Sequence, residues 1–166
     1  MLSFLFRGLT AEGASGAALF DALTAEARRP FWYLEGRVPD TLDGRFAVLA
    51  TLMALTLVRL ESEGDGGDRL SVALTERFIH VMESEHRELG IGDPTLGKMV
   101  RKLVGMLARR TELWRSCGDW GEATRESMYK DDSDEAAVER SGTALKNFRE
   151  LLAQASLESL EQGRLG

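Results

Sequence analysis

One stretch of the chain, Phe46–Val58, contains no charged residue and lies between Arg45 and Arg59. Drawn as a helix at about 100° per residue, it has apolar side chains on all sides, which is typical of a helix that its neighbours bury. Its 13 residues (46 to 58) are too few for a membrane span, which needs about 20. We therefore predict a core helix over about residues 41–60, surrounded by other helices.

The rest of the chain predicts helices as well. Apolar residues recur with helical spacing, whereas alternating Val, Ile and Thr runs, which would indicate strands, are scarce. The predicted helices cover residues 17–29, 70–89, 93–116, 119–129 and 135–155, with a last short turn from Ser156. For 166 residues one domain is the default. We predict an all-α, single-domain multi-helix bundle over residues 1–166, with the N-terminus (1–13) and the tail (162–166) as its mobile parts.

Glycine, proline and short polar residues indicate where the helices begin and end. Gly90 follows the last residue of a helical pattern, where a left-handed cap belongs. Asp93 and Pro94 indicate a helix start, because Asp93 can accept hydrogen bonds from free N–H groups and proline has none to lose. The composition of Ser62–Asp68 (SEGDGGD) predicts a flexible surface loop. Further candidate N-caps are Asp40 or Thr41 for the core helix and Ser133 or Asp134 for the last long helix.

The predicted helix over residues 93–116 has two different sides. Its apolar side carries Leu96, Val100, Leu103, Leu107 and Trp114. The opposite side, here called the basic face, carries Lys98, Arg101, Lys102 and Arg109. The helix has six basic and two acidic residues, a net charge of +4, so the rest of the chain, whose total is −6, carries −10. The basic face suits an anionic partner; alternatively it pairs with the protein's own carboxylates or is simply solvated.

Several chemistries are excluded by what the sequence lacks. The segment Gly92–Met99 matches G-x-x-x-x-G-K, but Met99 stands where a phosphate-binding loop needs Ser or Thr, and the preceding residues have a helical period. Glu83 and His86 form one Glu-x-x-His motif, whereas di-iron bundles need two. The single cysteine, Cys117, allows no internal disulfide. With no nucleophile–base pair either, we predict no enzymatic activity, no metal and no cofactor.

Two apolar or aromatic segments near the N-terminus are candidates for contacts. Trp32 and Tyr33 follow Arg28 and Arg29, and this cluster either binds a partner or packs over a core edge with its polar tips hydrogen bonded. The start of the chain, Met1–Leu9, is too short for a signal-peptide core and is expected to dock or fray rather than to enter a membrane surface. With no visible targeting leader, we expect a cytoplasmic protein.

Two longer segments resemble the ubiquinol–cytochrome c chaperone family, in matching order and spacing. They are WYLEGRVPDTLDGRFAVLATL, from Trp32 to Leu52, and Leu74–Arg110, which contains HRELGIGDPTLGK. The resemblance implies an α-helical protein that assists assembly of the respiratory cytochrome bc1 complex, of the shorter bacterial type. The matching motif residues are Trp32, Tyr33, Asp40, Asp43, Gly44, Arg45, Phe46, Arg77, Phe78, Arg87, Glu88, Gly90, Gly92, Asp93, Gly97 and Lys98.

The resemblance implies a non-catalytic chaperone whose partner is cytochrome b or another bc1 subunit. Contact with a membrane surface or a ribosome is a further expectation, and DNA binding is not expected from a chain of this acidity. The alternative is an RNA- or ribosome-associated protein that uses the helix 93–116. The residues expected to bind a partner are Trp32, Tyr33, Arg87, Lys98, Arg101, Lys102 and Arg109. Other motif residues are expected to form internal ion pairs: Asp43 with Arg45, and Arg77, Arg87 and Glu88.

Overall fold

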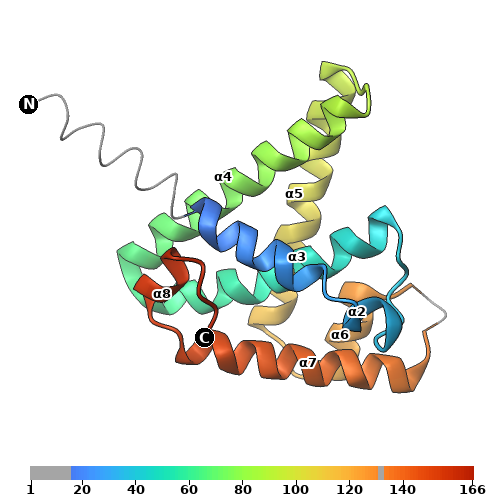
Figure 1. Ribbon diagram of the computed structural model, residues 1–166, viewed down its shortest axis with the longest axis vertical. Coiled ribbons are helices and arrows are strands. Elements are labelled where there is room, and N and C mark those ends of the chain that lie inside the picture. The colour runs from blue at the N-terminus through green and yellow to red at the C-terminus, as the bar shows by residue number, and fades with distance from the viewer. Residues whose placement is uncertain (1–15, 131–132) are drawn as a thin grey trace, which may run out of the picture.

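The computed structural model describes residues 16–130 and 133–166, and within these residues all regular structure is helical (Figure 1). A first helix covers residues 16–27. It is followed by α2 (Phe31–Leu34), α3 (Leu42–Leu60), the 3₁₀ turn η1 (Glu61–Glu63), α4 (Gly64–Glu88), α5 (Asp93–Arg115), α6 (Trp120–Met128), α7 (Glu135–Gln154) and α8 (Leu157–Glu161). The predicted all-α bundle is confirmed.

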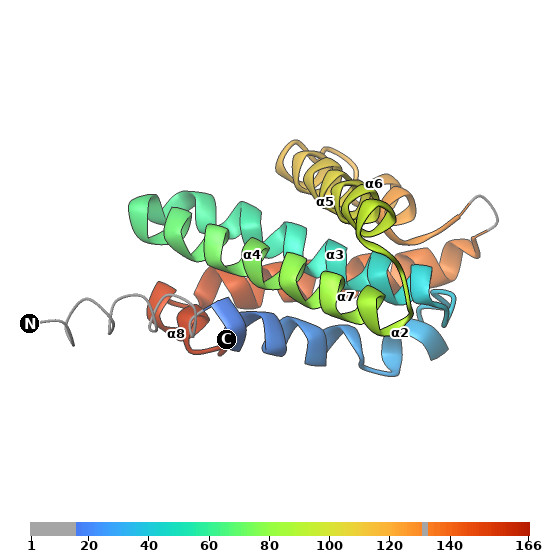
Figure 2. The same ribbon diagram turned by 90° about the horizontal axis from the view of Figure 1, so that it is seen from above.

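The helices lie in three layers when seen from above (Figure 2). One outer layer holds α5 and α6, the middle layer holds α3, α4 and α7, and the other outer layer holds the first helix, α2 and α8. Helices α4 and α5 form a hairpin whose far end projects from the remaining helices (Figure 1). The proposed mobility of residues 1–13 concerns residues outside the described ranges. The mobility of the tail 162–166 stays a prediction; Leu165 in the tail contacts the core.

Helix α3 contacts α4, α5, α6 and α7. Every residue from Ala47 to Thr56 is buried. The hydroxyl groups of Thr51 and Thr56 donate to main-chain carbonyls one turn earlier in the same helix, at 2.7 and 2.8 Å. Their polar atoms are therefore satisfied without a partner from another helix. Burial of each Leu or Met side chain here contributes about 1.5 to 3 kcal/mol, so the packing of α3 is a large part of the stability of the fold.

The segment Ser62–Asp68, which we expected to be a flexible loop, is helical, and that prediction is wrong. It forms the end of η1 and the first turn of α4. Gly64 has a φ of +60°, which reverses the chain after α3. A Cβ atom on Gly67 would lie 2.0 Å from the carbonyl oxygen of Leu60. The glycines therefore serve a close approach between the end of α3 and the start of α4, which composition alone does not distinguish from a loop.

The joint between α4 and α5 agrees with the sequence in one respect and differs in another. Gly90 has a φ of +81°, as expected for a left-handed cap. Helix α5 starts at Asp93, but Gly92 is its N-cap and no side chain caps it, so the expected capping role of Asp93 is wrong by one residue. A carboxylate in the first turn still interacts favourably with the helix dipole. At the other helix starts, Thr41 and Asp134 accept the capping hydrogen bonds expected of them.

Two arginines donate to main-chain carbonyls at the ends of helices from other parts of the chain. Arg59 of α3 donates to the carbonyl oxygens of Leu152 and Ala155, at 2.9 and 3.0 Å, at the end of α7. Arg110 of α5 donates through Nε and Nη2 to the carbonyl oxygen of Ser127, at 3.2 and 2.7 Å, at the end of α6. The last carbonyls of a helix have no partner within it, so each guanidinium supplies donors that the helix lacks.

Tyr129 joins α7 to the link between α2 and α3. Its hydroxyl donates to the carbonyl oxygen of Gly36 at 2.5 Å and lies 2.7 Å from Oγ of Ser141. A Cβ atom on Gly36 would lie 2.6 Å from the same Oγ, so the link lies directly on α7. Burial raises the pKa of the Tyr129 phenol, and its hydrogen bond with Ser141 acts in the opposite direction.

Replacing Arg59 by Met is expected to lower the free energy of unfolding by about 2 kcal/mol or more, because carbonyl groups at the end of α7 lose charged donors. Urea denaturation of both proteins measures the difference. Arg69→Met is the matched control, since Arg69 is exposed, and should change stability by no more than about 0.5 kcal/mol. Equal losses in the two variants would contradict the capping role of Arg59.

Stability is also expected to fall in alkali as Tyr129 ionises. Its pKa in the folded protein is raised, so its contribution is complete below the unfolded value of about 10 and is lost as the pH rises through the folded value. Tyr129→Phe should therefore unfold more easily at pH 8 and show a shallower decline between pH 9 and 11 than the wild type, followed by urea denaturation at each pH. A parallel decline in the two proteins would rule out Tyr129 as the source of the loss of stability in alkali.

Candidate partner-binding surfaces

Trp32 and Tyr33 hold α2 against the end of the first helix. Trp32 is 1% exposed, and its Nε1 donates to the carbonyl oxygen of Glu26 at 3.0 Å. Tyr33 is half-buried, and its hydroxyl donates to the carbonyl oxygen of Ala27 at 2.7 Å. Burial raises the pKa of the Tyr33 phenol. These contacts correspond to the packing alternative for the aromatic cluster, and partner binding by Trp32 and Tyr33 stays a prediction.

The basic face lies on the outer side of α5. All four of its residues are exposed, whereas Leu96, Val100, Leu107 and Trp114 on the opposite side are buried and Leu103 is half-buried. None of the four basic residues forms an ion pair with a carboxylate among residues 16–130 and 133–166. The two sides predicted from helical periodicity are thus the two sides found. Binding by the basic face remains a prediction.

Arg110 lies on the same helix but serves the interior. Its guanidinium lies over the ring of Phe46, 5.8 Å from the ring centroid, and donates to the end of α6. Burial lowers the pKa of Arg110, and the neighbouring charge of Arg109 acts in the same direction. The net charge of the helix includes Arg110, but its guanidinium is turned to the end of α6, whereas the four residues of the basic face are exposed.

The expected binding residues do not come together in one place. Arg87 is exposed near the end of α4, on the projecting hairpin. The basic face lies in one outer layer of the molecule, and Trp32 and Tyr33 lie in the other (Figure 2). The structure therefore does not join the expected binding residues into a single site.

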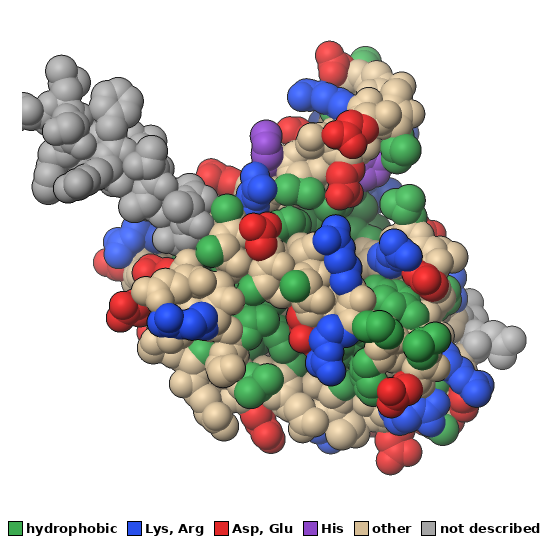
Figure 3. Space-filling model, in the orientation of Figure 1, with side chains coloured by type: hydrophobic (Ala, Val, Ile, Leu, Met, Phe, Trp, Pro, Cys, Tyr) green, Lys and Arg blue, Asp and Glu red, His purple; other side chains and the backbone are tan. Residues whose placement is uncertain are grey.

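The sequence analysis missed an apolar surface on α2 and the beginning of α3. Leu34 is 75% exposed and Leu42 is 70% exposed. Phe31, Tyr33 and Phe46 nearby are half-buried. Hydrophobic side chains gather over these two elements on the right of the molecule (Figure 3). We call Leu34, Leu42 and these three aromatic residues the α2–α3 surface.

Leu42 lies one turn before Phe46 in α3, and its exposure has a simple cause. It is the first residue of α3, before the buried part of the helix begins. Helical periodicity predicts the direction in which a side chain points. It does not predict whether a neighbouring helix extends far enough to cover that side chain. No signal in the sequence distinguishes Leu42 from a core leucine.

The motif ion pairs differ from those expected. Arg45 pairs with Asp40 at 2.7 Å, and Asp43 lies 3.5 Å from Lys130. The expected pairing of Asp43 with Arg45 is wrong, because residues two apart on a helix point in different directions. Arg45 has a raised pKa because of its hydrogen bond to Asp40.

The three other motif residues expected to form ion pairs, Arg77, Arg87 and Glu88, form none with the described part of the chain. The Nε atom of Arg77 is buried and has no hydrogen-bond partner there. A charged group in this position is costly unless it is paired. We find no structural account of Arg77.

The motif glycine at the start of α3 has a clear role. A Cβ atom on Gly44 would lie 1.8 Å from the carbonyl oxygen of Pro39. Thr41 accepts from the N–H of the same glycine at 3.1 Å. The motif between Asp40 and Arg45 thus folds the link back onto the first turn of α3, which positions the α2–α3 surface.

The described residues offer little to chemistry that needs a metal or a nucleotide. Among them no three His, Cys, Asp or Glu side chains are grouped so that they could hold a metal ion. The segment that resembles a phosphate-binding loop is helical from Asp93 onward, so its N–H groups do not surround a phosphate. Searched over the same residues, no helix is both long and apolar enough to cross a membrane.

Comparison with known proteins gave two matches. The family model for ubiquinol-cytochrome C chaperones matches residues 34–165. A solved structure, described as the crystal structure of the Cbp3 homolog from Brucella abortus, is similar with a TM-score of 0.81 and 26% sequence identity, covering 98% of this chain and 94% of that chain. No curated protein that was searched matches the chain.

Gly44→Ala is expected to destabilise the protein by about 1 to 3 kcal/mol, because the added methyl group displaces the carbonyl of Pro39. Gly105→Ala in the basic helix is the matched control: a Cβ atom there meets nothing within 4 Å. Since alanine favours a helix over glycine, this control should raise stability by about 0.5 to 1 kcal/mol. Thermal unfolding of both variants measures the two effects, and a stable Gly44→Ala protein would contradict the close packing.

Proposed function

Because the chain belongs to the ubiquinol-cytochrome C chaperone family, we propose that it is a non-catalytic assembly chaperone of the respiratory cytochrome bc1 complex. The family match over residues 34–165 carries the proposal. The similarity to the Brucella abortus structure supports it, because the likeness extends over nearly the whole of both chains. A chaperone acts by holding a surface and needs no catalytic group.

The client we propose is cytochrome b, a membrane subunit that presents apolar surface before it is assembled. An exposed apolar patch on a folded protein is a common mark of a protein-binding site. The α2–α3 surface supplies such a patch, with Leu34 and Leu42 as its most exposed side chains. Covering two leucine side chains stabilises a complex by about 2 to 4 kcal/mol, which favours a contact that is released when the bc1 partners arrive.

The packing around α2 supports this choice of surface. Trp32 and Tyr33 tie α2 to the first helix through hydrogen bonds, so Leu34 is presented on a fixed element. Thr41 and the Asp40–Arg45 pair fix the beginning of α3, which presents Leu42. In this proposal the motif residues position the leucines, and the work is done on the cytoplasmic side of the inner membrane.

The proposal predicts the phenotype of a host strain from which the gene is deleted. Such a strain should contain less assembled bc1 complex, because unassembled cytochrome b loses its chaperone. Reduced-minus-oxidised spectra of membranes measure cytochrome b, and native gels measure the assembled complex. Normal levels of both would reject the proposed function.

Complementation of the deletion strain tests the surface. The double variant Leu34→Ser, Leu42→Ser should restore clearly less bc1 complex than the wild type at equal protein level. Val72→Ser is the matched control: Val72 is 57% exposed and belongs to α4, outside the α2–α3 surface. If the double variant restores the complex fully while the deletion phenotype holds, the function stands and this surface is wrong.

A further inference from the structure

We propose that the basic face of α5 is a docking site for an acidic helix of another protein. From Pro94 to Thr111 the chain has five basic residues and no acidic residue, so the rest of the chain, whose total is −6, carries −11. One of the five, Arg110, is turned inward to the end of α6. The other four form the exposed basic face, separate from the α2–α3 surface and independent of the identity of the client.

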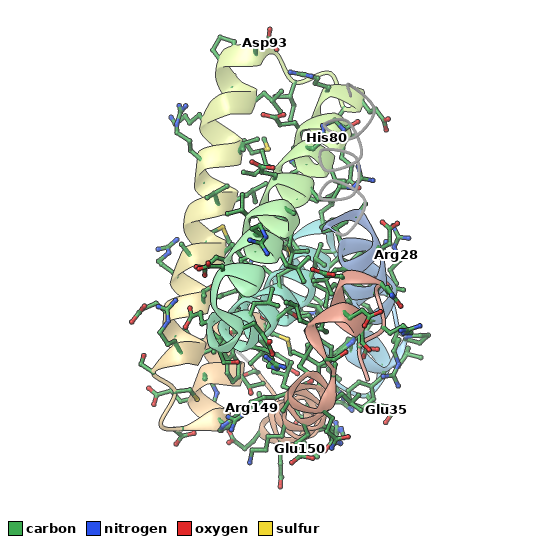
Figure 4. The ribbon with its side chains drawn as sticks, turned by 90° about the vertical axis from the view of Figure 1, so that its left-hand side faces the viewer. Arg28, Glu35, His80, Asp93, Arg149 and Glu150 are labelled. Carbon is green, nitrogen blue, oxygen red and sulfur yellow. The ribbon has the colours of Figure 1, made fainter. Side chains whose placement is uncertain are left out.

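The charges of the basic face are not used within the described chain. Some cations elsewhere pair with carboxylates: Arg115, less than two turns beyond Arg109, bonds with Glu61 and Glu112, and Arg59 pairs with Glu63. The basic face has no such partner in the part of the chain that the structure describes. Helix α5 lies at one edge of the molecule, where side chains on its outer side point away from the other helices (Figure 4).

The shape of the basic face favours a helix as the occupant. Gly105 lies in the middle of the four cations, and a Cβ atom there meets nothing within 4 Å. At Gly97 it would meet only the side chain of Arg101, at 3.6 Å. Without bulky side chains in the middle, a second helix can approach to about 8 Å between axes. The distance from Lys98 to Arg109 along the axis is about 16 Å, which is three turns of a partner helix.

The chemistry of the basic face disfavours two other anionic partners, a membrane surface and single-stranded RNA. A helix that binds a membrane surface inserts apolar side chains, but the apolar side of α5 is buried against the protein. Single-stranded RNA sites combine cations with exposed aromatic rings, and the only aromatic residue of α5, Trp114, is buried. Carboxylates spaced along a partner helix match a row of cations and require neither inserted apolar side chains nor exposed aromatic rings.

Direct binding to a model ligand tests the proposal. The probe is a fluorescein-labelled, alanine-rich helical peptide of about six turns with glutamate at each i, i+4 and i+7 position of one side. Fluorescence anisotropy with the full-length protein should show binding that weakens as salt is raised, because the contact is between exposed charges. Changing all four residues of the basic face to Gln should weaken binding at least about tenfold.

Two further variants separate helix docking from general charge attraction. Gly105→Leu keeps every charge but fills the open space in the middle of the basic face. It should also weaken binding by about tenfold, because the leucine side chain prevents the close approach of the partner helix. The matched charge control replaces four exposed cations on other elements by Gln: Arg28, Arg69, Lys146 and Arg164. This control should bind the peptide as the wild type does, and circular dichroism checks the folding of each variant.

Several results would overturn the proposal. Equal losses in the basic-face variant and the charge control, or an unchanged affinity in Gly105→Leu, would leave only general electrostatic attraction. Tighter binding to a 20-nucleotide uridine RNA or to vesicles of phosphatidylglycerol and phosphatidylcholine than to the peptide would favour those partners. Self-association of the wild type that the basic-face variant loses, seen by sedimentation, would assign the face to a second copy of this chain.

Discussion

Helices α6 and α7 end against other parts of the protein, and their last main-chain carbonyl groups need donors that neither helix contains. Arginine side chains from α3 and α5 supply them: Arg59 joins α3 to the end of α7, far along the chain, and Arg110 joins α5 to the end of the next helix, α6. The hydroxyl of Tyr129 does the same for the carbonyl of Gly36 in the link before α3. Apolar burial provides most of the folding free energy, but these polar contacts determine which helix ends meet.

The parts of the fold that local signals determine were predictable from the sequence. Helical period, the glycine at position 90 and the caps at Thr41 and Asp134 depend on a few neighbouring residues, and each was found where expected. The glycines of Ser62–Asp68 were misread, because a flexible loop and a close contact between helices require the same residue type. The arginine contacts at the ends of α6 and α7 join residues 17 to 96 positions apart, which is beyond the few neighbouring residues that define a cap or a helical period.

The same distinction applies to the candidate surfaces. The basic face was predictable, because it depends only on the period of one helix and on the side that is buried. The α2–α3 surface was not, because the exposure of Leu42 depends on where the neighbouring helices end. Trp32 and Tyr33, the aromatic residues expected to bind, have their polar atoms bonded to the first helix. For a residue at the end of a helix, such as Leu42, the neighbouring sequence does not reveal how exposed the side chain is.

Arginine at the helix ends and arginine on the basic face differ in whether lysine can replace them. At Arg59 the guanidinium reaches two carbonyl oxygens at once, and at Arg110 two of its nitrogens share one; lysine, whose charge is a single compact ammonium group, does not reproduce that planar fork. The cations of the basic face make no such contact within the described part of the chain, and lysine already stands at positions 98 and 102. Related chains should therefore exchange lysine and arginine freely on the outer side of α5 and keep arginine at the helix ends. The identity of the cation, rather than its charge, then distinguishes an architectural position from an exposed one.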